Sequence, residues 1–241
     1  MKTTITKLTV ILFLATFVTS CGFDMFNRVD GDRNVVSEKR KIDGDFTRVK
    51  VSNGLDLYIK QGKKASLTVE ADENLHEIII TEVRNGMLKI YTDKNIGRAK
   101  ARKVYLTVTS LEELKASSGS DVFSENILKA QDLEIGTSSG ADMKIEVDAD
   151  SVTSSSSSGS DLKVMGVSNS HSANASSGSS IHAYGLKSKD VTARVSSGAD
   201  INIYASASIN ARASSGGDIR FKGNPESVKK KTSSGGGVSS R

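Results

Sequence analysis

Hydrophobic and polar residues alternate along most of the chain, and from residue 116 onward the alternation returns at a nearly constant interval. A Ser-Ser-Gly phrase marks seven repeats, and the steps between their glycines are 21, 19, 19, 20, 18 and 19 residues. A fixed period of this length is typical of a solenoid, in which each repeat forms one coil stacked on the last. The glycines are Gly119, Gly140, Gly159, Gly178, Gly198, Gly216 and Gly235.

When the repeats are aligned on these glycines, apolar residues share columns that are separated by polar residues. One such column follows the phrase and holds Val122, Met143, Leu162, Ile181, Ile201, Ile219 and Val238. Period-two alternation predicts strands with one buried face. Each repeat should therefore supply two short strands, with the phrase at a bend where glycine accepts a positive φ. Continued alternation predicts that the second serine of each phrase points inward.

The rest of the chain is less regular. Residues 44–113 are predicted to be β-rich, with Asn85-Gly86 as a hairpin turn. Asn53-Gly54-Leu55-Asp56 resembles the later phrase, so the coils are expected to begin there with longer, decorated turns. This part could also close one end of the stack. The regular coils then occupy 114–241.

The first residues have the pattern of an export signal. Residues 1–20 combine Lys2 and Lys7 with the apolar run Leu8 to Val18, which is too short to span a bilayer. Val18-Thr19-Ser20-Cys21 resembles the lipobox of bacterial lipoproteins, and Cys21 is the only cysteine. We therefore expect a signal peptide, a lipid on Cys21 that holds the protein on a membrane, and a flexible polar tether over 21–43.

Charge excludes few functions. The formal net charge is +5, and loss of the two leader lysines leaves +3. The basic runs at 98–103 and 229–231 are interpreted as solvated faces, with acidic glycans or lipid headgroups as the alternative. No nucleic-acid partner is expected of an exported chain with few aromatic residues and no recognisable binding motif.

Over residues 45–225 the chain resembles the family described as "putative auto-transporter adhesin, head GIN domain". The resemblance rests on the lipobox, on Phe46-x-x-Val49-x-Val51-x-x-Gly54-Leu55-Asp56-Leu57, on Leu88-x-Ile90 and on the serial Ser-Gly-Ser/Ala-Asp phrases. It implies an all-β fold, a single-stranded right-handed β-helix with coils of about 19–20 residues, on a lipoprotein of the cell envelope. The protein is expected at the outer membrane, and the resemblance implies no catalytic residue in this chain.

One aspartate follows most of the phrases. Asp121, Asp142, Asp161, Asp200 and Asp218 form a column that Ser180 interrupts and Gly237 ends. We interpret each aspartate as a cap that accepts turn N–H groups. A calcium ladder is the alternative, but the phrase departs from the calcium-binding nonapeptide. No metal or cofactor is expected. The serine rows are likewise interpreted as turn hydrogen bonding, with ice or polysaccharide binding as the alternative.

Catalytic motifs are scarce. His171 falls in an apolar column and is expected in the core or at a corner, whereas His182 falls in a polar one. No Cys/His spacing suggests zinc, and no Gly-x-Ser-x-Gly elbow is present. Carboxylate pairs for glycoside cleavage remain open.

The sequence thus favours a non-enzymatic envelope lipoprotein that presents a β-helical surface to a glycan, a surface or a protein. The alternatives are a polysaccharide-processing enzyme on the same scaffold and a purely structural envelope protein. A homo-oligomer is left open.

Overall fold

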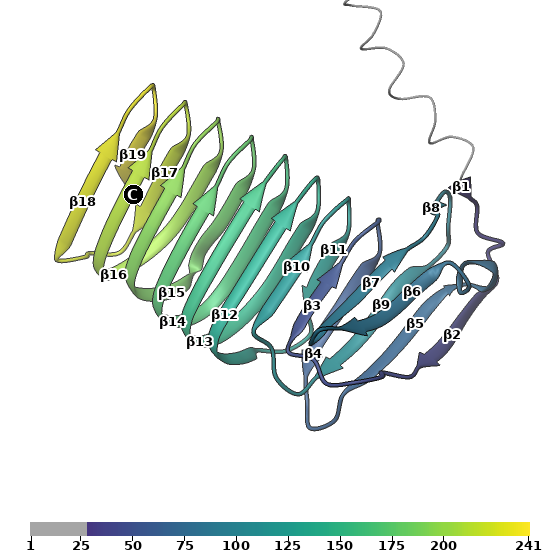
Figure 1. Cartoon of the computed structure of the whole chain (residues 1–241). Coiled ribbons are helices and arrows are strands. Elements are labelled where there is room, and N and C mark those ends of the chain that lie inside the picture. The colour runs from purple at the N-terminus through teal and green to yellow at the C-terminus, as the bar shows by residue number, and fades with distance from the viewer. Residues whose placement is uncertain (1–27) are drawn as a thin grey trace, which may run out of the picture.

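The computed structural model describes residues 28–241, which form parallel β-coils stacked along one axis (Figure 1). This confirms the predicted all-β solenoid. Nearly every long strand pairs in parallel with the strands of the coils on either side, and the N-terminal end carries the antiparallel pairs. Within 28–241, no helix is long and apolar enough to cross a membrane.

Each regular coil contributes to two opposite faces of the stack. The long strands β13 to β16 bend between the faces, so the first half of each lies on one face and the second half on the other. The regular part consists of β10 (Glu113–Ala116), β11 (Asp121–Ser124), β12 (Leu128–Ser138), β13 (Asp142–Ser157), β14 (Asp161–Ala175), β15 (Ser180–Val195), β16 (Asp200–Ala213), β17 (Asp218–Lys222), β18 (Ser227–Thr232) and β19 (Gly237–Ser240).

The apolar columns lie in register between the two faces. Ile201 pairs with Ile181 on one side and with Ile219 on the other, and all three side chains are fully buried. Burying each such side chain contributes roughly 1.5–3 kcal/mol, so the repeated columns are the main stabilising element. The core is continuous from the first coils to Phe221.

The Ser-Ser-Gly bends are tight turns along one edge of the stack. Ser158 has φ 56° and Gly159 has φ 66°, and the other phrases have the same pair of positive values. The prediction that the second serine points inward is wrong: these serines are exposed, and in every phrase but the last the residue after the glycine, such as Ser160, is buried instead. Two consecutive left-handed residues reverse the chain and shift the phase of the alternation.

The N-terminal coils do not follow chain order. After β3 (Arg48–Val51) and β4 (Asp56–Gln61), the chain leaves the stack and returns as β7 (Met87–Thr92) and β9 (Arg102–Val108), which pair with β3 and β4 from outside. The chain then crosses to the other side of β3 and β4, where β10 and β11 continue the stack. The first complete coil in the sequence is therefore the second layer of the structure.

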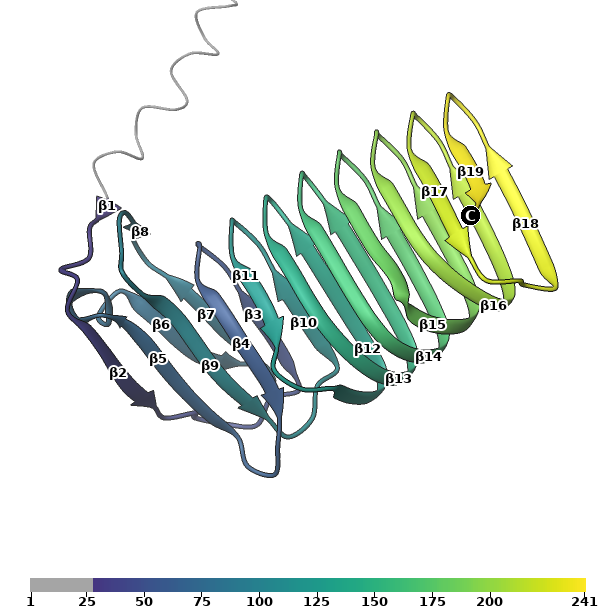
Figure 2. The same cartoon turned by 180° about the vertical axis from the view of Figure 1, so that it is seen from behind.

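The remaining strands close this end of the stack, as Figure 2 shows from behind. β5 (Ser66–Asp72) pairs antiparallel with β9, and β6 (Ile79–Arg84) pairs antiparallel with β7 through the Asn85-Gly86 turn. The 3₁₀ helix η2 (Glu73–Leu75) follows β5, and β1 (Arg28–Val29) pairs with β8 (Asn95–Ile96). At the opposite end of the stack, β18 and β19 form the last coil. Val228 of β18 is 44% exposed there.

Part of the expected tether is a strand. β2 (Val35–Arg40) pairs antiparallel with residues 67–72 of β5, so the prediction of a flexible segment over 21–43 is wrong for this part. Every residue of β2 is exposed or half-buried. Because an edge strand gains its stability from backbone pairing, its side chains need not alternate, and it can look like a polar linker in sequence.

Candidate functional site

The predicted aspartates form one column on the outer surface of β9, β4, β11, the first halves of β13 to β16, β17 and β19, which we call the aspartate face. Parallel register joins them coil by coil, and Asp56 is an additional member that lies between Lys103 and Asp121. The column runs Lys103, Asp56, Asp121, Asp142, Asp161, Ser180, Asp200, Asp218, Gly237. Asp56 was not predicted as a member of this column, although the likeness of Asn53-Gly54-Leu55-Asp56 to the later phrase is a sequence signal that could have identified it.

The interpretation of these aspartates as turn caps is wrong. The turn N–H groups donate to the neighbouring coil: the Gly159 N–H bonds the Ser177 carbonyl at 3.1 Å, and the Gly140 N–H bonds the Ser158 carbonyl at 3.2 Å. These donors are therefore already satisfied. The carboxylates that have side-chain partners are Asp200 and Asp218, which accept from opposite arms of Arg220 at 3.0 Å each.

Stacking carboxylates in register has an electrostatic cost. Partial burial raises the pKa of Asp121, and the charges of Asp56 and Asp142 raise it further. Burial also raises the pKa of Asp56, although Arg102 and Lys103 oppose the shift. Among residues 28–241, no three Asp, Glu, His or Cys side chains are grouped so that they could hold a metal ion.

The neighbouring outward column begins with a ladder of stacked aromatic rings. The ring of Tyr58 lies between Tyr105 and Phe123, with centroid separations of 5.2 Å and 5.4 Å and interplanar angles of 22° and 29°. These separations are in the range of favourable offset stacking. We call Tyr105, Tyr58 and Phe123 the aromatic ladder. Polar and cationic residues continue the column: Lys144, Lys163, His182, Asn202 and Arg220.

A hollow of about 350 Å³ adjoins the aromatic ladder. Its walls include Tyr58 and Phe123, with Lys144 and two carboxylates, Glu125 and Glu146. The Lys60 ammonium lies 3.5 Å from Glu125, and the Glu146 N–H donates to the Ser124 hydroxyl at 2.9 Å. Aromatic faces, carboxylates and an ammonium group thus meet on one surface, which is a set of groups that can bind a sugar ring.

Further tyrosines lie along the same face toward the C-terminal coils. The Lys187 ammonium lies 3.9 Å from the Tyr204 ring centroid, and the Lys222 ammonium lies 4.6 Å from that of Tyr184. Such cation–π contacts hold the rings in place. The aspartate face therefore carries aromatic groups at both ends.

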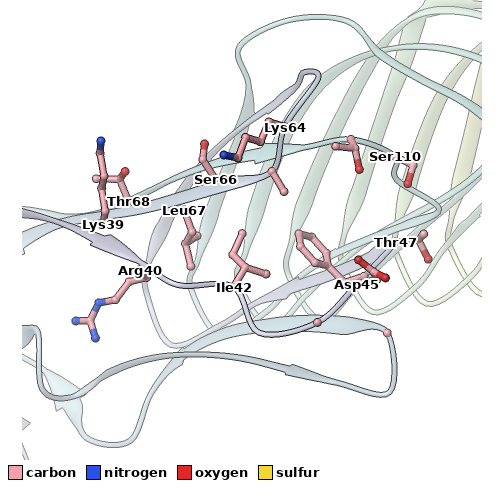
Figure 3. Close-up of a pocket in the computed structure, with 15 residues that line it drawn as sticks. Lys39, Arg40, Ile42, Asp45, Thr47, Lys64, Ser66, Leu67, Thr68 and Ser110 are labelled. Carbon is pink, nitrogen blue, oxygen red and sulfur yellow. The ribbon is translucent and has the colours of Figure 1, made fainter.

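A second hollow lies at the N-terminal end, between the β2–β3 loop and the β4–β5 turn (Figure 3). Its volume is about 940 Å³, and its walls combine Ile42, Phe46 and Leu67 with Lys39 and Lys64. Sequence reasoning did not identify it, because its walls come from loops and from β2, which had been assigned to the tether.

The three histidines differ in burial and lie in different parts of the fold. His171 is 2% exposed in the core, and its Nε2 lies 2.8 Å from the Ser154 hydroxyl. His182 is exposed and lies 3.3 Å from the Asn202 amide. His76 joins η2 to β2, with Nε2 at 3.1 Å from the Val36 carbonyl.

Asp72 is a structural carboxylate that sequence reasoning missed. It is fully buried, and it accepts the backbone N–H groups of Arg33, Lys100 and Ala101 at 3.0–3.1 Å. Burial raises its pKa, but these hydrogen bonds outweigh burial and leave the pKa below its usual value. The predicted lipidation residue Cys21 lies outside the described residues.

Comparison with known proteins agrees with this architecture. A putative adhesin from Bacteroides fragilis has a TM-score of 0.83 at 20% identity, covering 88% of this chain and 100% of its own. A putative lipid binding protein from Parabacteroides distasonis has a TM-score of 0.74 at 23% identity, covering 89% and 99%. A putative adhesin from Parabacteroides merdae has a TM-score of 0.70 at 20% identity, with the same coverage.

At these identities the likeness shows the shared fold. None of the curated proteins compared with the chain matches it. The family model described as "Putative auto-transporter adhesin, head GIN domain" matches residues 45–225, which is most of the chain. The protein therefore belongs to the putative auto-transporter adhesin, head GIN domain family.

Proposed function

We propose that the protein is an envelope lipoprotein that acts as an adhesion module and binds a glycan on its aspartate face. The aromatic ladder is the observation that carries this proposal. Tyr58 stands in the middle of three stacked rings, and all three rings are half-buried rather than enclosed in the core. Outward-facing aromatic groups on a rigid sheet provide a large contact area at low cost in conformational entropy.

The surroundings of the ladder fit a sugar better than an apolar partner. The C–H face of a sugar ring packs on an aromatic ring, while its hydroxyl groups need donors and acceptors at the edge. Lys144 and Glu146 line the hollow beside Phe123 and supply both kinds of group. The aspartate column lies two residues before the ladder on each strand and so faces the same way.

Family membership supports the adhesion role, and the lipobox at Cys21 supports anchoring in the outer membrane. The protein is proposed to have no catalytic activity. Anchoring is tested with Cys21→Ala in the native host: the wild-type protein should sediment with the outer membrane, and the variant should be soluble. A variant that remains in the membrane after a high-salt wash would contradict the anchor.

The glycan site is tested by applying the purified mature chain to a glycan array. Tyr58→Ala should weaken binding by about tenfold or more, because truncation of an aromatic hot-spot residue costs about 2 kcal/mol or more. Tyr58→Phe keeps the stacked ring and should retain most of the affinity. Tyr91→Ala is the matched control, since Tyr91 lies on β7 and donates to Glu82 at 3.2 Å. Equal binding by wild type and Tyr58→Ala would refute the site.

One observation favours a second candidate, a polysaccharide-processing enzyme. Glu125 and Glu146 line the same hollow as the aromatic rings, and paired carboxylates are the groups that cleave glycosidic bonds. A reducing-sugar assay on each array ligand distinguishes the two functions. The adhesion proposal expects no release of sugar, whereas release that Glu146→Gln abolishes would establish the enzyme.

A further inference from the structure

The face opposite the aspartate face carries a column of basic residues. We call this surface, formed by β7, β3, β10, β12, the second halves of β13 to β16 and β18, the basic face. Parallel register places one outward residue per coil in the column: Lys89, Lys50, Lys115, Gly136, Ser155, Asn174, Arg194, Arg212 and Lys231. Cations thus stand at both ends of the column, with small or neutral residues between them.

Lys115, toward the N-terminal end of the column, is neutralised within the molecule. The Lys115 ammonium lies 2.8 Å from Glu113 and 2.9 Å from Glu134, which belong to the adjacent outward column. Both contacts raise the Lys115 pKa. Lys115 therefore has little charge left for a ligand.

The cations at the C-terminal end have no such counterions. The adjacent column there holds Thr192, Asn210 and Lys229 in place of the glutamates. Within the part of the chain that the structure describes, none of Arg194, Arg212 and Lys231 has an ion-pair partner, and all three are exposed. Three cations on successive coils therefore point to solvent, and no carboxylate of the described chain neutralises their positive charges.

These cations line a groove of about 520 Å³. Its other walls are supplied by small apolar residues and by serine and asparagine side chains, among them Ser155, Asn174 and Ser196. Among residues 28–241, no carboxylate lines the groove. Guanidinium groups form paired hydrogen bonds with carboxylate and sulfate oxygens, and hydroxyl and amide groups can bind the remaining oxygens.

We propose that this groove binds a linear acidic polysaccharide that lies along the stack axis, with its acidic groups paired in turn with Arg194, Arg212 and Lys231. Successive coils are about 4.8 Å apart, a spacing comparable to the length of one sugar unit in an extended chain. The cations thus repeat at an interval that a polymer with one acid per sugar can match. A concave groove also suits a chain better than a flat bilayer surface.

This site is separate from the aspartate face and rests on the proposed function only in assigning the protein a role in glycan binding. The probe is polygalacturonate, with uncharged dextran as the comparison, and binding to the purified mature chain is measured by calorimetry. Polygalacturonate should bind, dextran should not, and affinity should fall as salt rises because exposed charges are screened.

Arg194→Ala with Arg212→Ala should weaken polygalacturonate binding by about tenfold or more, because charge-assisted hydrogen bonds are lost. Lys163→Ala, which removes an exposed cation from the aspartate face, is the matched control and should bind as wild type does. Both altered arginines are exposed, so the melting temperature should be unchanged. Tyr58→Ala should leave this binding intact, which separates the groove from the aromatic ladder.

Three results would overturn the proposal. The first is wild-type affinity in the double arginine variant. The second is binding of anionic phosphatidylglycerol vesicles or of single-stranded DNA with no binding of polygalacturonate, which would assign the groove to another class of partner. The third is a dimer in solution that the arginine variant dissociates, which would make the basic face an interface with a second copy.

Discussion

Ser154 and His171 form a hydrogen-bonded pair inside the apolar core, with 2.8 Å between the serine Oγ and the histidine Nε2. The two residues belong to successive coils, where Ile135, Ala173 and Ala193 share the Ser154 column. The other ring nitrogen, Nδ1, has no hydrogen-bond partner among the described residues. Within residues 28–241, this pair is the one place where a titratable ring interrupts the stacked core columns, and it should make stability depend on pH.

Burial lowers the pKa of His171 from 6.5 to about 4. The unfolded chain therefore takes up a proton at a higher pH than the folded chain, so stability is full above pH 6.5 and is lost as pH falls toward 4. The loss attributable to this residue should be roughly 3 kcal/mol by pH 4. Denaturant unfolding at pH 7 and pH 4 measures it.

The double variant Ser154→Ala with His171→Val is the control for this effect. It supplies the residue types that occupy the same columns in neighbouring coils, so the fold should be retained. Its loss of stability between pH 7 and pH 4 should be smaller than that of the wild type by the same amount. An identical pH dependence in the two proteins would mean that His171 is accessible to protons in the folded state.

Ile201 and Lys163 test the register of the coils. Ile201 is fully buried between two isoleucines, so Ile201→Asp places a charge in the core without a partner and should cost roughly 3 kcal/mol or more. Lys163 points outward, and Lys163→Ala should change stability by no more than about 0.5 kcal/mol. Thermal unfolding of both variants gives the comparison, and equal shifts in melting temperature would contradict the register.

The inward-facing apolar columns and the hairpin could be predicted from the sequence, because period-two alternation and turn residues are local properties of the chain. The Ile201 column could be read from the sequence, as could the Asn85-Gly86 hairpin. The inward placement of Ser158 was wrong because two left-handed residues break the phase of the alternation, and periodicity alone does not show such a break. The strand β2 was missed because it is itself an edge strand, and none of its side chains is buried to mark it as a strand.

The candidate site depended on topology that the sequence does not express. Tyr105 stacks on Tyr58 only because the chain folds back outside β3 and β4 before returning as β10. The basic column was likewise not predicted from the sequence, because Arg194 and Arg212 lie in separate repeats. Their lack of counterions depends on which residues lie beside them in the paired strands. The aspartate caps were wrong because the turn donors already bond the next coil.

The aspartate column should lower stability at neutral pH. Because burial and neighbouring carboxylates raise the pKa of Asp121, its charged form is less favourable in the folded chain than in the unfolded chain. Asp121→Asn should therefore increase the free energy of unfolding at pH 7, with the gain disappearing in acid, where the carboxyl is protonated in both states. Asp132→Asn, at an exposed position outside the column, should show no such gain.

The same column gives an expectation about calcium. Turn hydrogen bonds between coils account for the phrase without an ion, so a chelator should leave the melting temperature unchanged. An ion bound by the folded chain would instead raise that temperature with its concentration. A calcium-dependent rise that Asp142→Asn and Asp161→Asn abolish would make the column a cation site.

Gly159 and Ser158 test the turn that repeats along the edge. An added Cβ at Gly159 would meet no atom within 4 Å, so substitution there should act through backbone conformation alone. With φ at 66°, Gly159→Val should lower stability by about 1–2 kcal/mol. Ser158→Asn should stay within about 0.5 kcal/mol of wild type, because asparagine tolerates the left-handed region and Asn53 occupies it in the equivalent turn at φ 66°. Thermal unfolding of the two variants decides the matter: a Gly159→Val protein as stable as the wild type would show that this turn does not require a left-handed residue.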